Sequence, residues 1–158
     1  MFFTTVKFKF VNVEKAIRFI LTNLNNLYIS NYRLTDYILK KNIYLVEDNE
    51  AIREMVVYLL ESENFKVSSF ENATTFKDQI TITRPDLVIL DVMLPDGNGI
   101  TVGNELKSTA STQHIPVLLM SANANMVKDG KESLADDFIN KPFDINDLLQ
   151  RVEHLLKI

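Results

Sequence analysis

The chain has 158 residues, of which 46% are hydrophobic and 24% charged, and its formal net charge is −4 at pH 7. This balance is typical of one compact globular domain with a short appendage and excludes a disordered or fibrous protein. Cysteine is absent and histidine occurs twice, which excludes disulfide frameworks, thiol catalysis and histidine-rich metal sites. No apolar run approaches the length of about 20 residues that crosses a bilayer, so we expect no membrane span.

Charge divides the chain into two unequal parts. Residues 1–41 contain 7 Lys and Arg against 2 Asp and Glu, whereas residues 42–158 contain 10 against 19. Residues 1–41 also lack alternating strand and helix patterns, although apolar residues recur at helical spacing from Val13 to Leu27. We therefore predict a partly helical N-terminal extension at 1–41 and an acidic body at 42–158. The extension is either a translated leader without a fixed role or a helix that docks on the body or on a partner.

The body alternates short apolar runs with segments of helical periodicity. Five runs are strand candidates, three strong and two weaker: 43–46, 87–90 and 117–120, then 66–70 and 137–139. Runs that are apolar on both faces suit a parallel sheet covered by helices. Two helices show apolar stripes: Ile52, Met55, Val56, Leu59 and Leu60 in the first, and Ile145, Leu148, Leu149, Val152, Leu155 and Leu156 in the last. Five strands that alternate with about five helices predict an α/β fold.

Polar side chains follow four of the predicted strands. Glu47 and Asp48 follow the first strand, Asp91 the third, Ser121 the fourth and Lys141 the fifth. Ligands of open parallel sheets bind beyond the carboxyl ends of the strands, so we expect these five side chains at one rim. Three neighbouring carboxylates either raise a pKa or bind a cation. Oxygen ligands without His or Cys favour Mg²⁺ where waters and a phosphate complete the shell.

A metal ion at this rim makes phosphoryl chemistry possible. Once the ion offsets the negative charge, the Asp91 carboxylate can attack phosphorus and form an acyl phosphate. Lys141 then supplies a cation and Ser121 a hydroxyl for the phosphoryl oxygens, which is the electrostatic support that phosphoryl transfer needs.

Four short motifs at these strand ends resemble, in this order, those of the receiver domain of bacterial two-component response regulators. They read VEDN at 46–49, LDVMLPDGNG at 90–99, SA at 121–122 and DDFINKPF at 136–143. The resemblance covers residues 42–158. It implies a flavodoxin-like, doubly wound sheet of five parallel strands in the order 2-1-3-4-5, with helices on both faces.

The resemblance also implies a role for each matching residue. Asp91 would be the phosphoacceptor, with Lys141 as its ion partner and Ser121 as the hydroxyl that moves toward the phosphoryl group. The Mg²⁺ ligands would be Glu47, Asp48, Asp91 and the backbone carbonyl of Met93. Phe138 would be an aromatic switch residue that repacks together with Ser121. The peptide bond between Lys141 and Pro142 would be cis, a form that X-Pro bonds adopt at small cost.

Two departures from the family pattern fall around the predicted fourth helix. Ser121 and Lys141 are 20 positions apart, slightly fewer than the family leads us to expect, and Leu134 stands where glycine is common. We therefore expect a reshaped surface there beside an intact pocket. The other polar candidates receive structural interpretations: Asp136 and Asp137 as solvated, 96–99 as a turn, and His114 and His154 as surface residues.

These inferences predict a phosphorylation-dependent signalling switch in a two-component phosphorelay, not an enzyme. Asp91 would accept a phosphoryl group from a histidine kinase or histidine phosphotransfer protein, and the domain would act on a downstream partner through protein contacts. Only 17 residues follow Lys141, so we expect no output domain, and the acidic body predicts no direct contact with nucleic acid. We expect a cytoplasmic monomer or weak dimer that docks through the fourth helix, the fifth strand and the closing helix.

Two alternatives remain open. The first is a Mg²⁺-dependent phosphohydrolase with an aspartyl-phosphate intermediate, similar to the haloacid dehalogenase family, which places a second Asp two positions after the nucleophile. Here that position is Met93, which cannot transfer a proton. The second is a receiver-like scaffold without phosphorylation, which requires a broken pocket, whereas all five pocket residues are present. The apolar Met93 also predicts slow self-dephosphorylation.

Overall fold

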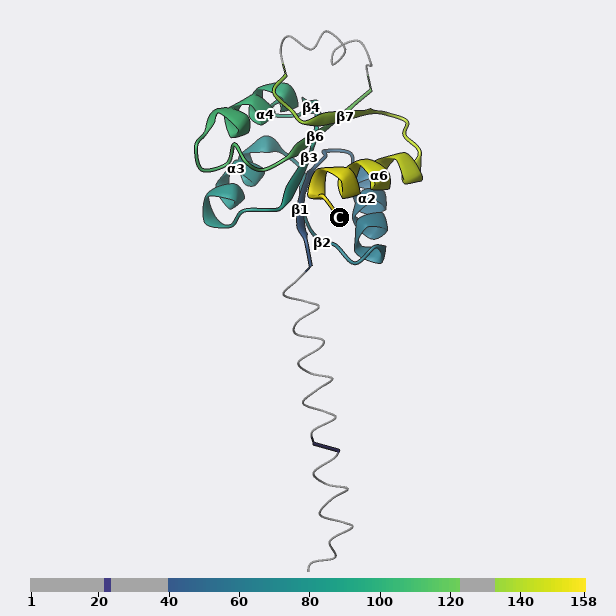
Figure 1. The fold of residues 1–158 in the computed structure, drawn as a ribbon. Coiled ribbons are helices and arrows are strands. Elements are labelled where there is room, and N and C mark those ends of the chain that lie inside the picture. The colour runs from purple at the N-terminus through teal and green to yellow at the C-terminus, as the bar shows by residue number, and fades with distance from the viewer. Residues whose placement is uncertain (1–21, 24–39, 123–132) are drawn as a thin grey trace, which may run out of the picture. The chain divides into compact units, whose positions relative to one another are not determined.

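The computed structural model describes residues 22–23, 40–122 and 133–158, and the fold is that of the unit Lys40–Ile158. Five parallel strands form one sheet in the order β2-β1-β3-β6-β7 (Figure 1). The strands are β1 (Asn42–Val46), β2 (Lys66–Phe70), β3 (Leu87–Asp91), β6 (Val117–Ser121) and β7 (Asp137–Asn140). Counted among themselves, they follow the order 2-1-3-4-5, so the predicted doubly wound α/β fold is confirmed.

Helices cover both faces of this sheet. The described helices are α2 (Glu50–Ser62), α3 (Ala73–Ile82), α4 (Gly99–Ser108) and α6 (Ile145–Leu156). α3 and α4 lie on one face, and α2 and α6 lie on the other (Figure 1). Because side chains alternate along a strand, Ile43 and Leu45 of β1 pack toward α2 and α6, while Tyr44 and Val46 pack toward α3 and α4. The runs that are apolar on both faces therefore supply two separate cores.

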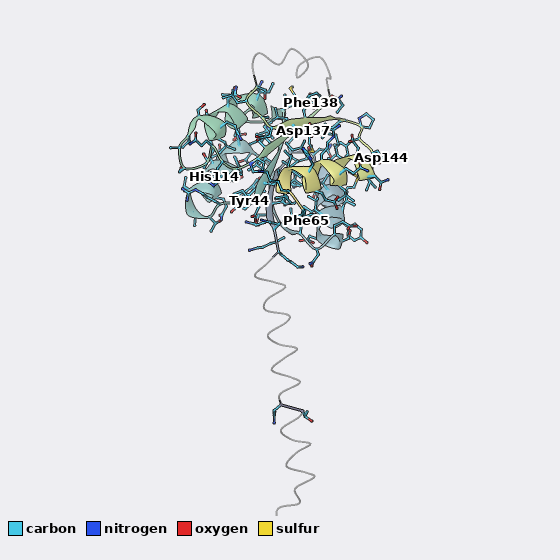
Figure 2. The ribbon with its side chains drawn as sticks, in the orientation of Figure 1. Tyr44, Phe65, His114, Asp137, Phe138 and Asp144 are labelled. Atoms are coloured by element: carbon cyan, nitrogen blue, oxygen red, sulfur yellow. The ribbon has the colours of Figure 1, made fainter. Side chains whose placement is uncertain are left out.

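Polar capping residues start all four described helices. They are Asn49 in α2, Asn72 in α3, Asn98 in α4 and Asp144 in α6, and each accepts a backbone N–H from the first turn. Figure 2 shows Asp144 where α6 begins. Such side chains satisfy amide groups that have no partner within the helix. Asn49, Asn72 and Asp144 lie two to four residues after the ends of β1, β2 and β7, so the carboxyl-end rim of the sheet receives the positive ends of helix dipoles.

The buried rows of the helices are narrower than the predicted stripes. Met55 is 44% exposed and Ile145 is 47% exposed, which contradicts their placement on the core-facing stripes. The buried residues are spaced four positions apart: Val56 and Leu60 in α2, and Leu148, Val152 and Leu156 in α6. Met55 lies about 100° around the helix from Val56, and Ile145 is the first residue of its helix, so neither reaches the sheet fully.

Asp136 and Asp137 are paired, so the prediction that they are merely solvated is wrong. The Asp136 carboxylate accepts hydrogen bonds from Lys107 Nζ and from the N–H of Val117, both at 2.8 Å. Asp137, on β7, accepts from Arg151 Nη1 at 2.9 Å. Burial lowers the pKa of Arg151, but the hydrogen bonds and charges of Asp137 and Asp147 together outweigh it and raise that pKa. Both acids tie the edge strand β7 to the helices beside it.

Some predicted features lie outside the described residues. The expected fourth helix does so entirely, and the helix expected from Val13 to Leu27 does so except for Thr22 and Asn23, which are helical. Within the described part of the chain, no helix is long and apolar enough to cross a membrane. His114 and His154 are exposed, as predicted.

Candidate functional site

Three carboxylates meet at the carboxyl ends of β1 and β3. These strands pair in parallel with Val46 opposite Leu90, so the residues that follow, Glu47 and Asp91, also lie side by side. Carboxylate oxygens of Glu47, Asp48 and Asp91 lie within 4.8 Å of one another. Glu47 and Asp91 are 0% and 3% exposed, whereas Asp48 is exposed. Two buried acids therefore form the floor of the site, and the third faces solvent.

Lys141 brings one cation to these acids. Its Nζ atom lies 2.6 Å from Oε2 of Glu47 and 2.8 Å from Oδ2 of Asp91, so one ammonium group donates to both buried carboxylates. Its backbone N–H donates to the carbonyl of Ser121 at 2.7 Å, which holds Lys141 beside the end of β6. The Lys141–Pro142 peptide bond is cis, as expected. Buried charges require such partners because water no longer solvates them.

Three carboxylates face the single ammonium group of Lys141, and the effect of the excess negative charge is evident at Glu47. Burial is the main reason that the pKa of Glu47 lies above its ordinary value; the hydrogen bond and charge of Lys141 oppose this rise, and the charge of Asp91 adds to it. Oε1 of Glu47 is buried and has no hydrogen-bond partner among the described residues. A hard divalent cation would satisfy this oxygen and offset the surplus charge, so the three carboxylates fit such an ion.

Arg53 holds the loop that carries two of the acids. Its Nη1 atom donates to the backbone carbonyl oxygens of Glu47 at 2.8 Å and Asp48 at 3.0 Å. Arg53 lies in the first turn of α2, where the Asn49 side chain also accepts the N–H of Ile52 at 3.1 Å. The guanidinium group therefore fixes the backbone of this loop and leaves both carboxylates available to a cation.

A short ribbon follows Asp91. It consists of β4 (Met93–Leu94) and β5 (Gly97–Asn98), which pair in antiparallel fashion around a turn at Pro95 and Asp96. The turn predicted at 96–99 is therefore wrong in its extent, because residues 97–98 are extended and Gly99 begins α4.

The ribbon returns to the backbone of Asp91. The N–H of Met93 donates to Oδ1 of Asp91 at 3.3 Å, and the N–H of Gly99 donates to the carbonyl of Val92 at 2.9 Å. A Cβ atom on Gly99 would lie 2.0 Å from the backbone oxygen of Asp91, so this close approach requires glycine. The Met93 side chain is 64% exposed, so the backbone of Met93, not its side chain, is what the loop brings to Asp91.

Ser121 and Phe138 occupy different parts of the sheet. Asp91 lies opposite Met120 in the β3–β6 register, so Ser121 stands one position further toward the rim, where it is 2% exposed. Phe138 of β7, labelled in Figure 2, lies opposite Leu119 of β6. It is half-buried and packs against the core beneath α3 and α4. Ser121 therefore belongs to the rim, and Phe138 belongs to one face of the sheet.

Comparison with known families agrees with this geometry. The profile of the family described as "Response regulator receiver domain" matches residues 43–153. The chain belongs to this family. The resemblance read from four short motifs is thereby confirmed.

Curated relatives of this receiver domain are longer proteins. The phosphate regulon transcriptional regulatory protein PhoB of Escherichia coli (strain K12) is 37% identical over 120 residues, which cover 74% of this chain and 52% of that protein. The DNA-binding dual master transcriptional regulator RpaA of Synechocystis sp. is 35% identical over 118 residues, covering 73% of this chain and 48% of that protein. This chain therefore spans about half the length of the curated relatives it matches.

Solved structures of receiver domains share the fold. A putative response regulator from Chloroflexus aurantiacus J-10-fl is 26% identical with a TM-score of 0.71, and the match covers 75% of this chain and 99% of that one. The signal receiver domain of a histidine kinase from Syntrophus aciditrophicus is 31% identical with a TM-score of 0.69, covering 74% and 90%. The response regulator TrrA of Thermotoga maritima, in complex with Mg(2+)-BeF, is 27% identical with a TM-score of 0.67, covering 73% and 98%.

The receiver domain brings together most of the residues that sequence reasoning selected. Glu47, Asp48, Asp91 and Lys141 converge, Ser121 stands at the same rim, and the Met93 backbone adjoins Asp91, whereas Phe138 lies apart on β7. Sequence reasoning missed Arg53. Its only signal is its place six residues after Glu47 in a helix that begins at Glu50, which does not reveal that its side chain reaches back to two carbonyl groups.

Proposed function

We propose that this receiver domain accepts a phosphoryl group on Asp91 from the phosphohistidine of a histidine kinase or histidine phosphotransfer protein, and that phosphorylation changes its contacts with a downstream partner. The observation that carries the proposal is the setting of Asp91. Its carboxylate is buried at a strand end, pairs with Lys141 at 2.8 Å, and stands within 4.8 Å of Glu47 and Asp48. This arrangement supports attack on phosphorus rather than a structural ion pair, because the acids exceed the cation.

The cluster would bind Mg²⁺ through Glu47, Asp48, Asp91 and the carbonyl of Met93. The ion, when bound, supplies positive charge that lets an anionic carboxylate meet an anionic phosphoryl group. Arg53 keeps the backbone of Glu47 and Asp48 in place through its hydrogen bonds to their carbonyl groups. The unpartnered Oε1 of Glu47 supports this assignment, because a metal ligand must offer a free oxygen.

The transfer itself exchanges one bond to phosphorus for another. A carboxylate oxygen of Asp91 forms a bond to phosphorus while the phosphorus–nitrogen bond of the donor histidine breaks, and the imidazole nitrogen keeps the electron pair. Lys141 donates a hydrogen bond to Oδ2 of Asp91 before transfer and would pair with a phosphoryl oxygen afterwards. The Ser121 hydroxyl at the rim would donate to another phosphoryl oxygen, and the half-buried Phe138 would repack on β7 as Ser121 moves.

A switch suits this site better than a phosphohydrolase. The position two residues after Asp91 carries the apolar, 64% exposed side chain of Met93, which cannot act as a general acid or base. A scaffold without phosphorylation is also disfavoured, because the described acids and Lys141 form a complete cluster. We propose that the domain works in the cytoplasm, as a monomer or weak dimer, through modest protein contacts.

Incubation with acetyl phosphate and Mg²⁺, followed by intact-mass measurement, tests this function. We expect the full chain to gain one phosphoryl group and Asp91→Asn to gain none. Asp78→Asn is a matched control on the exposed face of α3 and should be labelled like the wild type. No mass gain in the wild type would support a scaffold instead, and repeated turnover of phosphate esters would support an enzyme.

A further inference from the structure

The N-terminus of α3 is capped by two side chains that come from different parts of the chain. Asn72, its own capping residue, accepts the N–H of Thr75 at 2.9 Å. Asp96 lies more than twenty residues later, yet its carboxylate accepts the N–H of Ala73 and the N–H of Thr74, each at 2.8 Å. It also accepts the Thr74 hydroxyl at 2.6 Å. Hydrogen bonds from Thr74 and Ala73 lower the pKa of Asp96, as expected for a carboxylate at a helix N-terminus.

Asp96 also stands at the turn of the ribbon that follows Asp91. The ribbon has two residues in each strand, with Met93 opposite Asn98 and Leu94 opposite Gly97. So short a pair of strands is not stable by itself in water, and its position must come from its attachments. At its base the ribbon is held by the hydrogen bond from the N–H of Gly99 to the carbonyl of Val92, beside the close approach of Gly99 to the Asp91 backbone. At its turn it is held by the three hydrogen bonds of Asp96 to α3.

We propose that Asp96 is a positioning residue for phosphoryl acceptance by Asp91. By tying the turn of the ribbon to α3, it holds the Met93 backbone against the Asp91 carboxylate, where the N–H of Met93 meets Oδ1 at 3.3 Å. The same residue sets where the carbonyl of Met93 lies. Small errors in such geometry slow reactions strongly. This inference rests on the proposed function, and it adds a residue that touches none of the reacting atoms.

Asn72 provides a matched control for the competing explanation, which is that Asp96 only stabilises α3. Both side chains satisfy amide groups in the first turn of the same helix, so loss of either should weaken that turn. Only Asp96 is also part of the ribbon. A purely structural role therefore predicts the same behaviour for Asn72→Ala and Asp96→Ala, and a positioning role predicts that they differ.

The experiment compares the full-length wild type with Asp96→Ala, Asp96→Asn and Asn72→Ala. Hydrogen–deuterium exchange without added metal reports the ribbon and α3 separately, and intact mass during incubation with acetyl phosphate and Mg²⁺ reports the labelling rate of Asp91. We expect both alanine variants to exchange faster in α3. Only Asp96→Ala should also exchange faster at 92–98 and be labelled about tenfold more slowly. Asp96→Asn keeps one acceptor oxygen and should recover part of the rate.

Each outcome decides one question. Equal labelling rates for Asp96→Ala and Asn72→Ala, with a labelled wild type, overturn the positioning role and leave the proposed function intact. An unlabelled wild type overturns the proposed function, whatever the variants do. If Asp96→Ala does not fold by circular dichroism, the comparison is made with Asp96→Asn, and a wild-type labelling rate in that variant overturns the inference.

Discussion

Opposite ends of the same two strands, β1 and β3, carry two different kinds of ion pair. At the amino end, Lys41 pairs with Asp86 at 3.0 Å, and the side chains are 42% and 38% exposed. At the carboxyl end, Lys141 pairs with Glu47 and Asp91, whose side chains are 1% and 5% exposed. One end is balanced and solvated, whereas the other is buried and holds more acid than base.

The difference in burial and charge balance indicates that the pair at the amino end is structural and that the cluster at the carboxyl end is a ligand site. The Asp86 carboxylate also accepts the N–H of Asn42 at 2.8 Å, so both of its oxygens are used in holding the start of the sheet. At the carboxyl end, Oε1 of Glu47 has no partner among the described residues, and Asp48 adds a further negative charge. A fold gains nothing from burying charge in excess of its partners, so the surplus acids at this rim point to a ligand.

Replacing the paired lysine should lower the free energy of unfolding much more at the carboxyl end of the strands than at the amino end. Lys141→Met leaves two buried carboxylates without their cation, and we expect it to lower the free energy of unfolding by about 3 kcal/mol. Lys41→Met breaks an exposed, solvent-screened pair and should cost less than about 1 kcal/mol. Urea unfolding in a buffer with chelator measures both. Similar losses at the two ends would remove the basis of the comparison.

Magnesium should stabilise the chain through one end of β3 only. At a concentration 100 times its dissociation constant, Mg²⁺ should raise the free energy of unfolding of the wild type by about 2.7 kcal/mol. We expect Asp48→Asn to lose most of this gain, because the proposed ligand Asp48 is exposed and its replacement costs the fold little. Asp86→Asn should respond to Mg²⁺ as the wild type does. A thermal or urea series over Mg²⁺ concentration checks this, and equal responses would contradict a metal site at the rim.

The smallest predicted effect concerns the lifetime of the acyl phosphate. The exposed, apolar Met93 offers no group to orient water, so we expect a half-life of minutes or longer. Met93→Asn should shorten it several-fold, because an amide can hydrogen-bond a water molecule near Asp91. Met55→Asn, which changes another exposed methionine on α2, should leave it unchanged. Loss of the phosphoryl mass over time gives both values, and a wild-type half-life of seconds would refute this view of Met93.

Much of the sheet could be predicted because buried strands have a recognisable pattern of apolar residues in the sequence. The strands β1, β3 and β6 are apolar on both faces, and this pattern alone places them inside two helical layers. Once their ends are known, the carboxyl-end rule brings Glu47, Asp91 and Ser121 to one rim without any structure. The same rule places Lys141 at this rim, although its strand, β7, has a weaker apolar pattern.

The partners of exposed polar residues could not be predicted in this way. Asp136 pairs with Lys107, which is 29 residues earlier, and Asp96 caps a helix that begins 23 residues earlier. Arg53 reaches backbone carbonyls, which every residue has, so no sequence pattern marks its targets. Sequence periodicity reports which face is buried, whereas these contacts depend on how separate elements are placed.

Gly99 limits how this chain can change over generations. Any other amino acid there would bring a side-chain carbon to 2.0 Å from the Asp91 carbonyl oxygen, whereas a Cβ on nearby Gly97 would come no closer than 3.9 Å to a neighbour. A second substitution to a smaller neighbouring side chain could not compensate for the loss of Gly99, because the clash is with a backbone atom. Descendants that still use Asp91 should therefore vary freely at Gly97 long before they vary at Gly99.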